Sequence, residues 1–410
     1  MLLSKDKFYK AFFYLYFFLL PIVAALESIS SGSNKIFNAI FMVLLVFAVF
    51  DLYRRSWTNI YIVLFVVFSL SIFFMNSIVY GLDLASEYDP SMSEGIKIGF
   101  RILMLAFMTY FAYLLTRFEV LKIKDLMYIS FFLVFSMLIG QIIGSDDIST
   151  VSGEGNEFAL QGLVGHVAIT SSVLLSVVPI LLINSSKSTL NFLVLALCFT
   201  AIIFTFRRSA WLIFIVLGLA HLYMMYFRNN SDALQKLKVM VLIIAGTVGI
   251  GVLLMLNQDV SNAIMTRLED LNVAQGGTGA GRSVFWGILW DYTLNQPMIN
   301  FFVGNGYGFI QGLLENRFGS AIGAHNDWLD FFLSFGVLPL IIFAIMVIIL
   351  TSYTLQKNRV HRQLLAYCLF CLVTLSMTTG GAFDTYFAFL HATIGFALAS
   401  QDNAKESSNG

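Results

Sequence analysis

Long apolar runs separated by short polar segments occupy almost the whole chain of 410 residues. A helix needs about 20 mostly apolar residues to cross a bilayer. Twelve runs approach or reach that length, at residues 11–29, 36–53, 58–76, 97–116, 126–144, 161–184, 190–206, 210–227, 239–256, 334–354, 364–379 and 383–400. Because backbone polar groups inside a bilayer must be bonded within the protein, these runs predict helices. We therefore predict an all-α polytopic membrane protein, with about twelve transmembrane helices in a single transmembrane domain over residues 1–400.

The composition excludes several other classes of protein. Hydrophobic residues make up 58% of the chain and charged residues 12%, with a mean hydropathy of +0.82. Soluble globular proteins are roughly 45–50% apolar and about 25% charged. Too few polar side chains remain here to cover a water-exposed surface, so a soluble enzyme, a secreted disulfide-rich domain and a disordered chain are excluded. Membrane lipids are expected around the chain, and no nucleic-acid partner is expected.

The distribution of charge predicts the orientation of the spans. With the N-terminus inside, 16 of the 24 Lys and Arg residues fall on the inner side, and 17 of the 24 acidic residues fall on the outer side. An excess of Lys and Arg marks cytoplasmic loops. Both termini are therefore predicted to be cytoplasmic, and a short polar tail, 401–410, is expected to be disordered.

The largest polar segment is expected on the outer side, where a loop of roughly 75 residues covers 257–333. It contains the glycine-rich segment Gly276–Ser283, in which Arg282 follows the glycines, and a second cluster with Gly304, Gly306 and Gly308. Glycines let a backbone approach a ligand closely and expose its N–H groups. The alternative is a turn-rich loop without a ligand. Arg282 favours a loop that handles phosphate or sugar.

Two adjacent arginines, Arg207 and Arg208, lie at the outer end of a predicted span, against the general charge bias. Charged residues at such positions are costly and are candidates for function. A guanidinium group matches phosphate oxygens in a bidentate geometry, which favours an anion site. The alternative is an interfacial pair that is balanced by outer carboxylates.

His325 is the most informative histidine because it stands where the large loop returns to the membrane, in the segment Ala324–Asp330. An imidazole there could accept a proton from a sugar hydroxyl. Asp327 or Asp330 could orient it, although helical spacing favours Leu329 over Asp330 as its neighbour. The alternative is a solvated interfacial histidine. The outer acidic residues show no metal-ligand spacing, so no metal and no cofactor are expected.

Three motifs resemble those of the O-antigen ligase and Wzy-type polysaccharide polymerase superfamily of bacterial inner-membrane proteins. Arg208-Ser209-Ala210-Trp211 resembles its Arg-Gly-x-Trp segment, with Ser in place of Gly. Gly281-Arg282 with Trp286, followed by Gly304–Gly308, resembles its large-loop pattern. Ala324-His325-Asn326, with Leu329 and Gly336, resembles its His-Asn motif. Together the motifs cover roughly residues 200–345.

The resemblance implies a GT-C-like, metal-independent, inverting glycosyltransferase that acts on the periplasmic face of the inner membrane. It would move a glycan from undecaprenyl diphosphate to a sugar hydroxyl. By this resemblance Arg208 and Arg282 bind the diphosphate and stabilise its leaving charge, and His325 is the base. Arg207 would be a second phosphate contact. Asn326, Asp327, Gly306 and Gly308 are the other residues expected to bind substrate.

The acceptor distinguishes a polymerase from a ligase. Lipid A core, the acceptor of a ligase, often carries phosphates, whereas the outer side of this chain is acidic overall. A glycan acceptor, and hence a polymerase, is therefore favoured over a ligase, with a chain-length regulator as a further partner. A transporter of lipid-linked glycan or of an anionic solute, and a non-catalytic assembly subunit, are the remaining alternatives.

Overall fold

The computed structural model shows an all-helical chain over the residues that it describes. These residues are 5–29, 33–53, 59–84, 91–143, 167–185, 187–205, 207–224, 282–318, 323–356, 361–378 and 381–409. Six of the described helices are long and apolar enough to cross a membrane, and four shorter apolar helices accompany them. The predicted class, an all-α polytopic membrane protein, is confirmed. The number of twelve spans and the outer location of the large loop stay predictions.

Helices occur at the predicted spans wherever the chain is described. They are α1 (Lys5–Ile29), α2 (Ser33–Tyr53), α3 (Ile60–Gly81), α4 (Met92–Arg117), α5 (Ile123–Ile143), α6 (Val167–Asn184), α7 (Thr189–Phe204), α8 (Arg208–Tyr223), α15 (Val337–Leu355), α16 (Arg362–Thr378) and α17 (Ala388–Asn409), with the 3₁₀ turn η3 (Thr385–Phe387) before α17. The predicted span 239–256 lies outside the described residues.

The chain divides into two compact units, of which the first comprises Met1–Val43 and Phe118–Asn272. In this unit α6 packs against α5, α7 and α8, and α1 packs against α5. The start of α5 is tied to α1 by Asp125, a buried carboxylate. Its Oδ1 lies 2.8 Å from Nζ of Lys10 and accepts a hydrogen bond of 2.9 Å from the Tyr14 hydroxyl. The N-terminal ends of α1 and α5 therefore lie at the same end of this unit, as the predicted topology requires.

The second unit comprises Leu44–Arg117 and Val273–Gly410, and α4 is its central helix, packed against α3 and α17. Small residues allow this close packing. A Cβ atom at Gly395 of α17 would lie 2.0 Å from the carbonyl oxygen of Thr109 in α4. The Ser69 hydroxyl of α3 donates a hydrogen bond of 2.7 Å to the carbonyl of Gly99 in α4. Close approach of helices at small residues is typical of membrane bundles.

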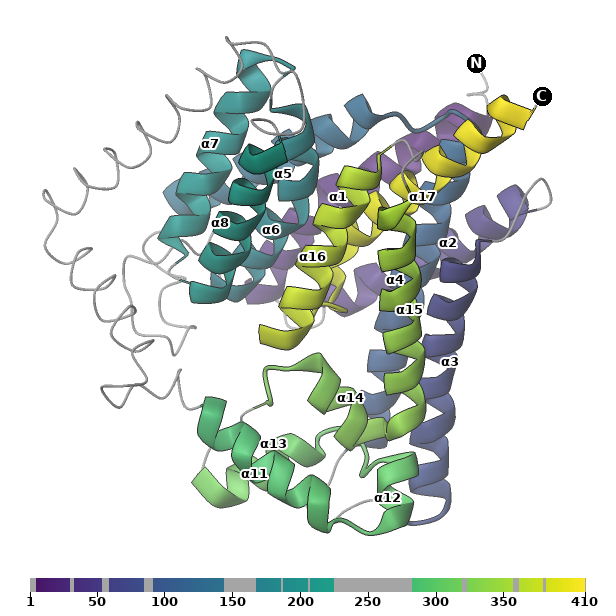
Figure 1. Cartoon of the computed structure of the whole chain (residues 1–410), viewed down its shortest axis with the longest axis vertical. Helices are drawn as coiled ribbons and strands as arrows, with labels where there is room; N and C mark the ends of the chain where they lie inside the picture. Colours follow the sequence, from purple (N-terminus) through teal and green to yellow (C-terminus); the bar gives the residue numbers. More distant parts are fainter. Residues whose placement is uncertain are drawn as a thin grey trace, which may run out of the picture. The chain divides into compact units, whose positions relative to one another are not determined.

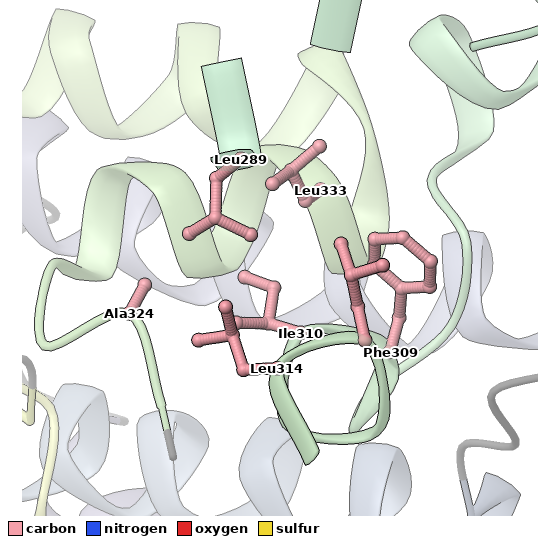
Figure 2. Packing of buried hydrophobic residues seen from close by; sticks show 7 residues of the cluster. Leu289, Phe309, Ile310, Leu314, Ala324 and Leu333 are labelled. Atoms are coloured by element: carbon pink, nitrogen blue, oxygen red, sulfur yellow. The ribbon is translucent and has the colours of Figure 1, made fainter. Parts of the chain in front are cut away.

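Four short helices form the described part of the predicted large loop: α11 (Arg282–Asn295), α12 (Met298–Val303), α13 (Phe309–Phe318) and α14 (Asp327–Phe335). They gather beside one end of the long helices α3 and α15 (Figure 1). The core shared by α11, α13 and α14 contains Leu289 of α11, Phe309 and Ile310 of α13, Ala324, and Leu333 of α14 (Figure 2). This part of the predicted loop is therefore a packed helical layer with its own buried core.

Several boundaries differ from the sequence predictions, among them the starts of α1 and α4, which lie six and five residues earlier. The span predicted at 334–354 begins three residues later, because Gly336 with φ = +77° separates α14 from α15. The polar tail, expected to be disordered from residue 401, instead continues α17 as a helix to Asn409. Apolar runs do not report such ends, because a glycine with positive φ breaks a helix inside apolar sequence and a polar helix can extend beyond its span.

Candidate functional site

A cavity of about 330 Å³ lies in the second unit, where α4, α14 and the segments around Tyr307 and Gly381 meet. Its polar lining residues are Arg101, Tyr307, Gln311, His325, Asp327, Asp330, Ser334 and Asp384. Aromatic side chains at Phe331, Phe335 and Phe383 also line it. The volume falls at the lower end of the roughly 300–1,000 Å³ of small-molecule sites, and a few convergent polar groups among aromatic walls are typical of such sites.

His325 lines this cavity from a bend just before α14, not from within a helix. Its φ of +52° lies in the left-handed region, which is uncommon for residues other than glycine. Asn326 follows as the N-cap of α14, and its side-chain oxygen accepts hydrogen bonds from the backbone N–H groups of Trp328 and Leu329. The helical spacing considered for His325 therefore does not apply. Asn326 contributes by fixing the point where α14 begins.

The predicted substrate residue Asp327 is buried and holds together two distant parts of the chain. One of its oxygens accepts a hydrogen bond from the backbone N–H of Gly381, and the other accepts one of 2.9 Å from that of Ala382. The Ala382 carbonyl in turn accepts a hydrogen bond of 3.1 Å from Nε2 of His391. The connector between α16 and η3, residues 381–384, is thereby fixed against α14.

The second carboxyl group of the segment, Asp330, lies in the same cavity without a bond to this connector. Burial raises its pKa to about 8, and the neighbouring charge of Asp327 raises it too, against the lowering effect of the backbone amides of Ala324 and Asn326. Burial also raises the pKa of Asp327, but the two connector amides stabilise its charged form. The pKa of Asp327 is raised only to about 7, so Asp327 is the first of the two carboxyl groups to ionise and Asp330 keeps its proton to higher pH.

The cluster Gly304–Gly308 is built by backbone contacts with α14. Asn305 is completely buried, and its amide accepts from Tyr292 and Asn300 and donates to Gln296 and Leu333. The N–H of Gly306 donates a hydrogen bond of 3.0 Å to the carbonyl of Ser334. Gly308 lines the cavity, with Tyr307 beside it. Of the two predicted glycines, Gly308 thus reaches the cavity and Gly306 is engaged with the end of α14.

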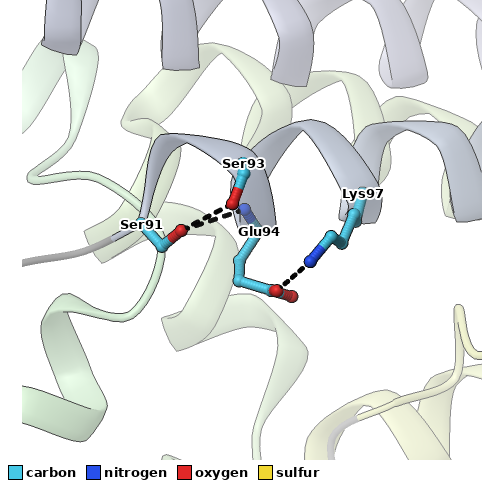
Figure 3. A network of polar contacts seen from close by, with 4 residues as sticks. All are labelled: Ser91, Ser93, Glu94 and Lys97. Atoms are coloured by element: carbon cyan, nitrogen blue, oxygen red, sulfur yellow. Dashed lines mark hydrogen bonds and ion pairs between the residues drawn. The ribbon is translucent and has the colours of Figure 1, made fainter. Parts of the chain in front are cut away.

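The cavity wall opposite these loops includes Arg101, from the third turn of α4. The start of this helix is fixed by a polar network in which the hydroxyl groups of Ser91 and Ser93 lie 2.8 Å apart (Figure 3). The backbone N–H of Glu94 donates to the Ser91 hydroxyl, and the Glu94 carboxylate pairs with Lys97. A Ser residue capping the N–H of a Glu three positions later is a typical helix start.

The three predicted phosphate-binding arginines occupy helix starts. Arg282 opens α11, whose Trp286 donates a hydrogen bond of 2.9 Å to the Ala324 carbonyl, directly before His325. Arg207 and Arg208 belong to the first unit, where they precede and open α8. There the indole N–H of Trp211 donates to the carbonyls of Ile202 and Ile203 at the end of α7. The motif tryptophans therefore fix the chain around each arginine position.

Several cavity residues escaped the sequence analysis. Arg101 and Asp384 both lie inside predicted spans, where ionisable residues are costly and mark functional sites. That signal, which was applied to Arg207 and Arg208, could also have found these two. Tyr307 lies within the motif Gly304–Gly308 but was not itself predicted to bind substrate, and no sequence pattern indicated Gln311. Within the described part of the chain, no group of three or more His, Cys, Asp or Glu residues could hold a metal ion.

The fold and the cavity define a polytopic membrane protein with a polar site at the ends of its long helices. Residues 193–344 match the family model described as O-antigen ligase. This region contains the three motifs and confirms the resemblance to the O-antigen ligase and Wzy-type superfamily. Together with the apolar helices, the match supports a multi-pass membrane protein that resembles this superfamily over residues 193–344. A comparison with curated proteins finds no match.

Proposed function

We propose that this chain is a glycosyltransferase that moves a glycan from undecaprenyl diphosphate to a sugar hydroxyl on the periplasmic face of the membrane. The observation that carries the proposal is the position of His325 in the polar cavity, within the region that matches the O-antigen ligase family. His325 is presented by a bend whose following residue caps α14, so the imidazole is held at a fixed point of the cavity wall.

In the proposed reaction His325 takes the proton of the acceptor hydroxyl as its oxygen attacks the anomeric carbon of the donor. The new glycosidic C–O bond forms while the bond from that carbon to the diphosphate oxygen breaks. Attack opposite the diphosphate inverts the anomeric centre, and undecaprenyl diphosphate leaves with the bonding electrons. Arg208 and Arg282 are assigned to the diphosphate, where positive charge stabilises the leaving group, with Arg207 as a second contact. No metal takes part in this scheme.

The cavity favours a glycan acceptor over a phosphorylated one. Of the three carboxyl groups in its lining, Asp330 holds a proton near neutral pH, which leaves those of Asp327 and Asp384 against the single guanidinium of Arg101. Such a wall repels a phosphate more than a neutral sugar. A polymerase that extends a lipid-linked glycan is therefore the first candidate, with a chain-length regulator as its partner. A ligase that transfers the glycan to lipid A core is the second, supported by the description of the matching family.

The test is a reconstituted assay with purified protein and undecaprenyl-diphosphate-linked repeat units, without nucleotide or added metal. A ladder of longer lipid-linked glycans is expected of a polymerase. Transfer only after lipid A core is added would identify a ligase. An absence of transfer to either acceptor would contradict the proposal and favour a transporter, which vesicle uptake of the lipid-linked glycan would detect.

His325→Asn is the sharpest variant, because Asn tolerates the left-handed backbone that His325 adopts. Loss of a positioned base commonly lowers the rate about 10²- to 10⁴-fold. His325→Asn and Arg282→Ala should show such a loss, while the exposed Arg317→Gln should retain activity. An active His325→Asn protein would show that His325 is not the base.

A further inference from the structure

We propose that the cavity is a subsite for one neutral, hydroxyl-rich sugar ring of the acceptor, and that Arg101 and Asp384 determine which ring it accepts. The inference rests on the proposed function, in which His325 activates an acceptor hydroxyl at this cavity. Both residues lie outside the region 193–344 that matches the O-antigen ligase family. They are assigned from their place in the cavity alone.

The size and the walls of the cavity fit one ring better than a lipid or a long glycan. The space of about 330 Å³ is small, and aromatic side chains at Tyr307, Phe331, Phe335 and Phe383 form part of its wall. Tyr307 and Phe335 lie nearly parallel, with ring centroids 6.2 Å apart. An aromatic face packs well against the C–H face of a sugar ring, while the ring hydroxyls need polar partners at its edge.

Arg101 and Asp384 supply polar partners of opposite kinds. A guanidinium only donates hydrogen bonds and an ionised carboxylate only accepts them. Together they can donate to the oxygen of one ring hydroxyl and accept from the O–H of another. Both influence the pKa of Tyr307, which burial raises, Arg101 lowers and Asp384 raises. Among the described residues Arg101 forms no ion pair with a carboxylate. Its charge is therefore open to a ligand.

The charge of the cavity argues against an anionic ligand. The Asp327 carboxylate accepts hydrogen bonds from the backbone N–H groups of Gly381 and Ala382. Oδ1 of Asp384 accepts hydrogen bonds from the Tyr386 N–H and the Thr385 hydroxyl. Binding a diphosphate here would place two or more negative charges beside these carboxylates, with one arginine to compensate. Hydrogen bonds from neutral hydroxyl groups suit the same carboxylates without that repulsion.

Asp327 acts as the positioning residue for this wall. Its bonds to the connector amides hold residues 381–384 against α14. Phe383 fixes the connector further, with ring centroids 5.4 Å from Phe331 and 5.1 Å from Phe343. The connector follows Asp327 in sequence by more than 50 residues. Its place in the cavity therefore depends on these tertiary contacts.

Two measurements on the full-length protein separate sugar binding from diphosphate binding. The first is the KM for the lipid-linked glycan, and the second is the inhibition constant of undecaprenyl diphosphate without a glycan. Asp384→Asn and Arg101→Gln should each raise the KM about 10- to 100-fold, as expected for losing a charge-assisted hydrogen bond. The inhibition constant should change less than twofold. The exposed pair Asp291→Asn and Arg317→Gln should alter neither quantity.

A rise in the inhibition constant with Arg101→Gln would show that the cavity binds the diphosphate, and would overturn the proposal. An unchanged KM in both variants would overturn it as well. If the wild-type protein transfers no glycan, the proposed reaction is wrong. The sugar subsite is then tested separately, by measuring whether the free oligosaccharide binds. The oligosaccharide released from the donor by mild acid should bind the wild type in isothermal titration calorimetry, and should bind Asp384→Asn at least about 10-fold more weakly. No binding to the wild type would then reject the sugar subsite.

Discussion

At the scale of single residues, the two carboxyl groups of α14 differ in what surrounds them. Asp327 accepts hydrogen bonds from backbone N–H groups on both oxygens, whereas Asp330 is half-buried next to Asp327 and lacks such bonds from the connector. One residue fixes the chain and the other retains a proton near neutral pH. The sequence could identify both as neighbours of His325, but it could not assign these separate roles. The separate roles depend on hydrogen bonds from the backbone N–H groups of residues 381 and 382, which are distant in sequence.

The raised pKa of Asp330 predicts how stability depends on pH. Between its ordinary pKa of about 4 and its folded value of about 8, the folded chain holds a proton that the unfolded chain releases. This proton should therefore lower folding stability as the pH rises from about 4 to 8, by at most about 1.4 kcal/mol per pH unit, and its effect should level off above pH 8. The apparent Tm in detergent from pH 5 to 9 measures this, and Asp330→Asn should reduce the slope, leaving the part that the raised pKa of Asp327 contributes.

Asp291→Asn is the matched control, because Asp291 is exposed on α11. Its curve should keep the slope of the wild type. Equal slopes in the wild type and Asp330→Asn would show that Asp330 ionises normally in the folded protein.

At the scale of elements, the backbones at the ends of α12 and α14 lie in close contact, and this contact positions the cavity wall. A Cβ atom at Gly336 would lie 2.1 Å from the carbonyl oxygen of Phe302, and one at Gly304 would lie 2.3 Å from that of Ser334. Both glycines also have positive φ, +77° and +87°. The ends of α12 and α14 can approach this closely only because neither position carries a side chain.

Gly336→Ala should therefore destabilise the protein by about 2 kcal/mol or more, because it combines a steric clash with an unfavourable backbone conformation. Gly287→Ala is the control, since a Cβ atom there would meet nothing within 4 Å and the position is helical. That change should stabilise the protein by about 0.5–1 kcal/mol. Chemical denaturation in detergent measures both, and equal stability of the two variants would contradict this account.

The helices themselves could be predicted better than the contacts between them. Apolar runs predicted α1 to α8 and α15 to α17 because each run must satisfy its backbone within a helix. The motif residues His325 and Asp327 were found because polar groups stand out where a loop returns to a span. The place of Gln311 and of the connector backbone at residues 381–383 in the cavity could not be predicted, because they reach it through contacts between distant segments.

At the scale of the whole molecule, each unit brings together segments that the topology assigns to one side of the membrane. Lys10 and Asp125 meet in the first unit, and both belong to predicted inner segments. Arg101, His325 and Asp384 meet in the second unit, and all belong to predicted outer ends. These groupings agree with the predicted alternation of the spans, whereas the assignment of the cytoplasmic side rests on the charge bias alone and stays a prediction.

Cysteine labelling tests that orientation. In a chain with Cys198, Cys368 and Cys371 replaced by Ala, Asp83→Cys should react with an impermeant maleimide in intact spheroplasts. Lys124→Cys should react only after the membrane is opened, because its segment is predicted to be cytoplasmic. Asp83 and Lys124 are both exposed. The opposite pattern would invert the proposed topology and place His325 on the cytoplasmic side.

The link from Asp327 to Gly381 and Ala382 has a consequence for chimeric proteins. A graft of residues 193–344 into a related protein would transfer His325 and Asp327 but leave the connector of the recipient in place. The transplanted Asp327 would then bind the connector of the recipient protein. The hybrid should therefore carry out the reaction of the grafted segment but select the acceptor sugar of the recipient. Exchanging residues 381–384 alone would change that choice and leave the reaction intact.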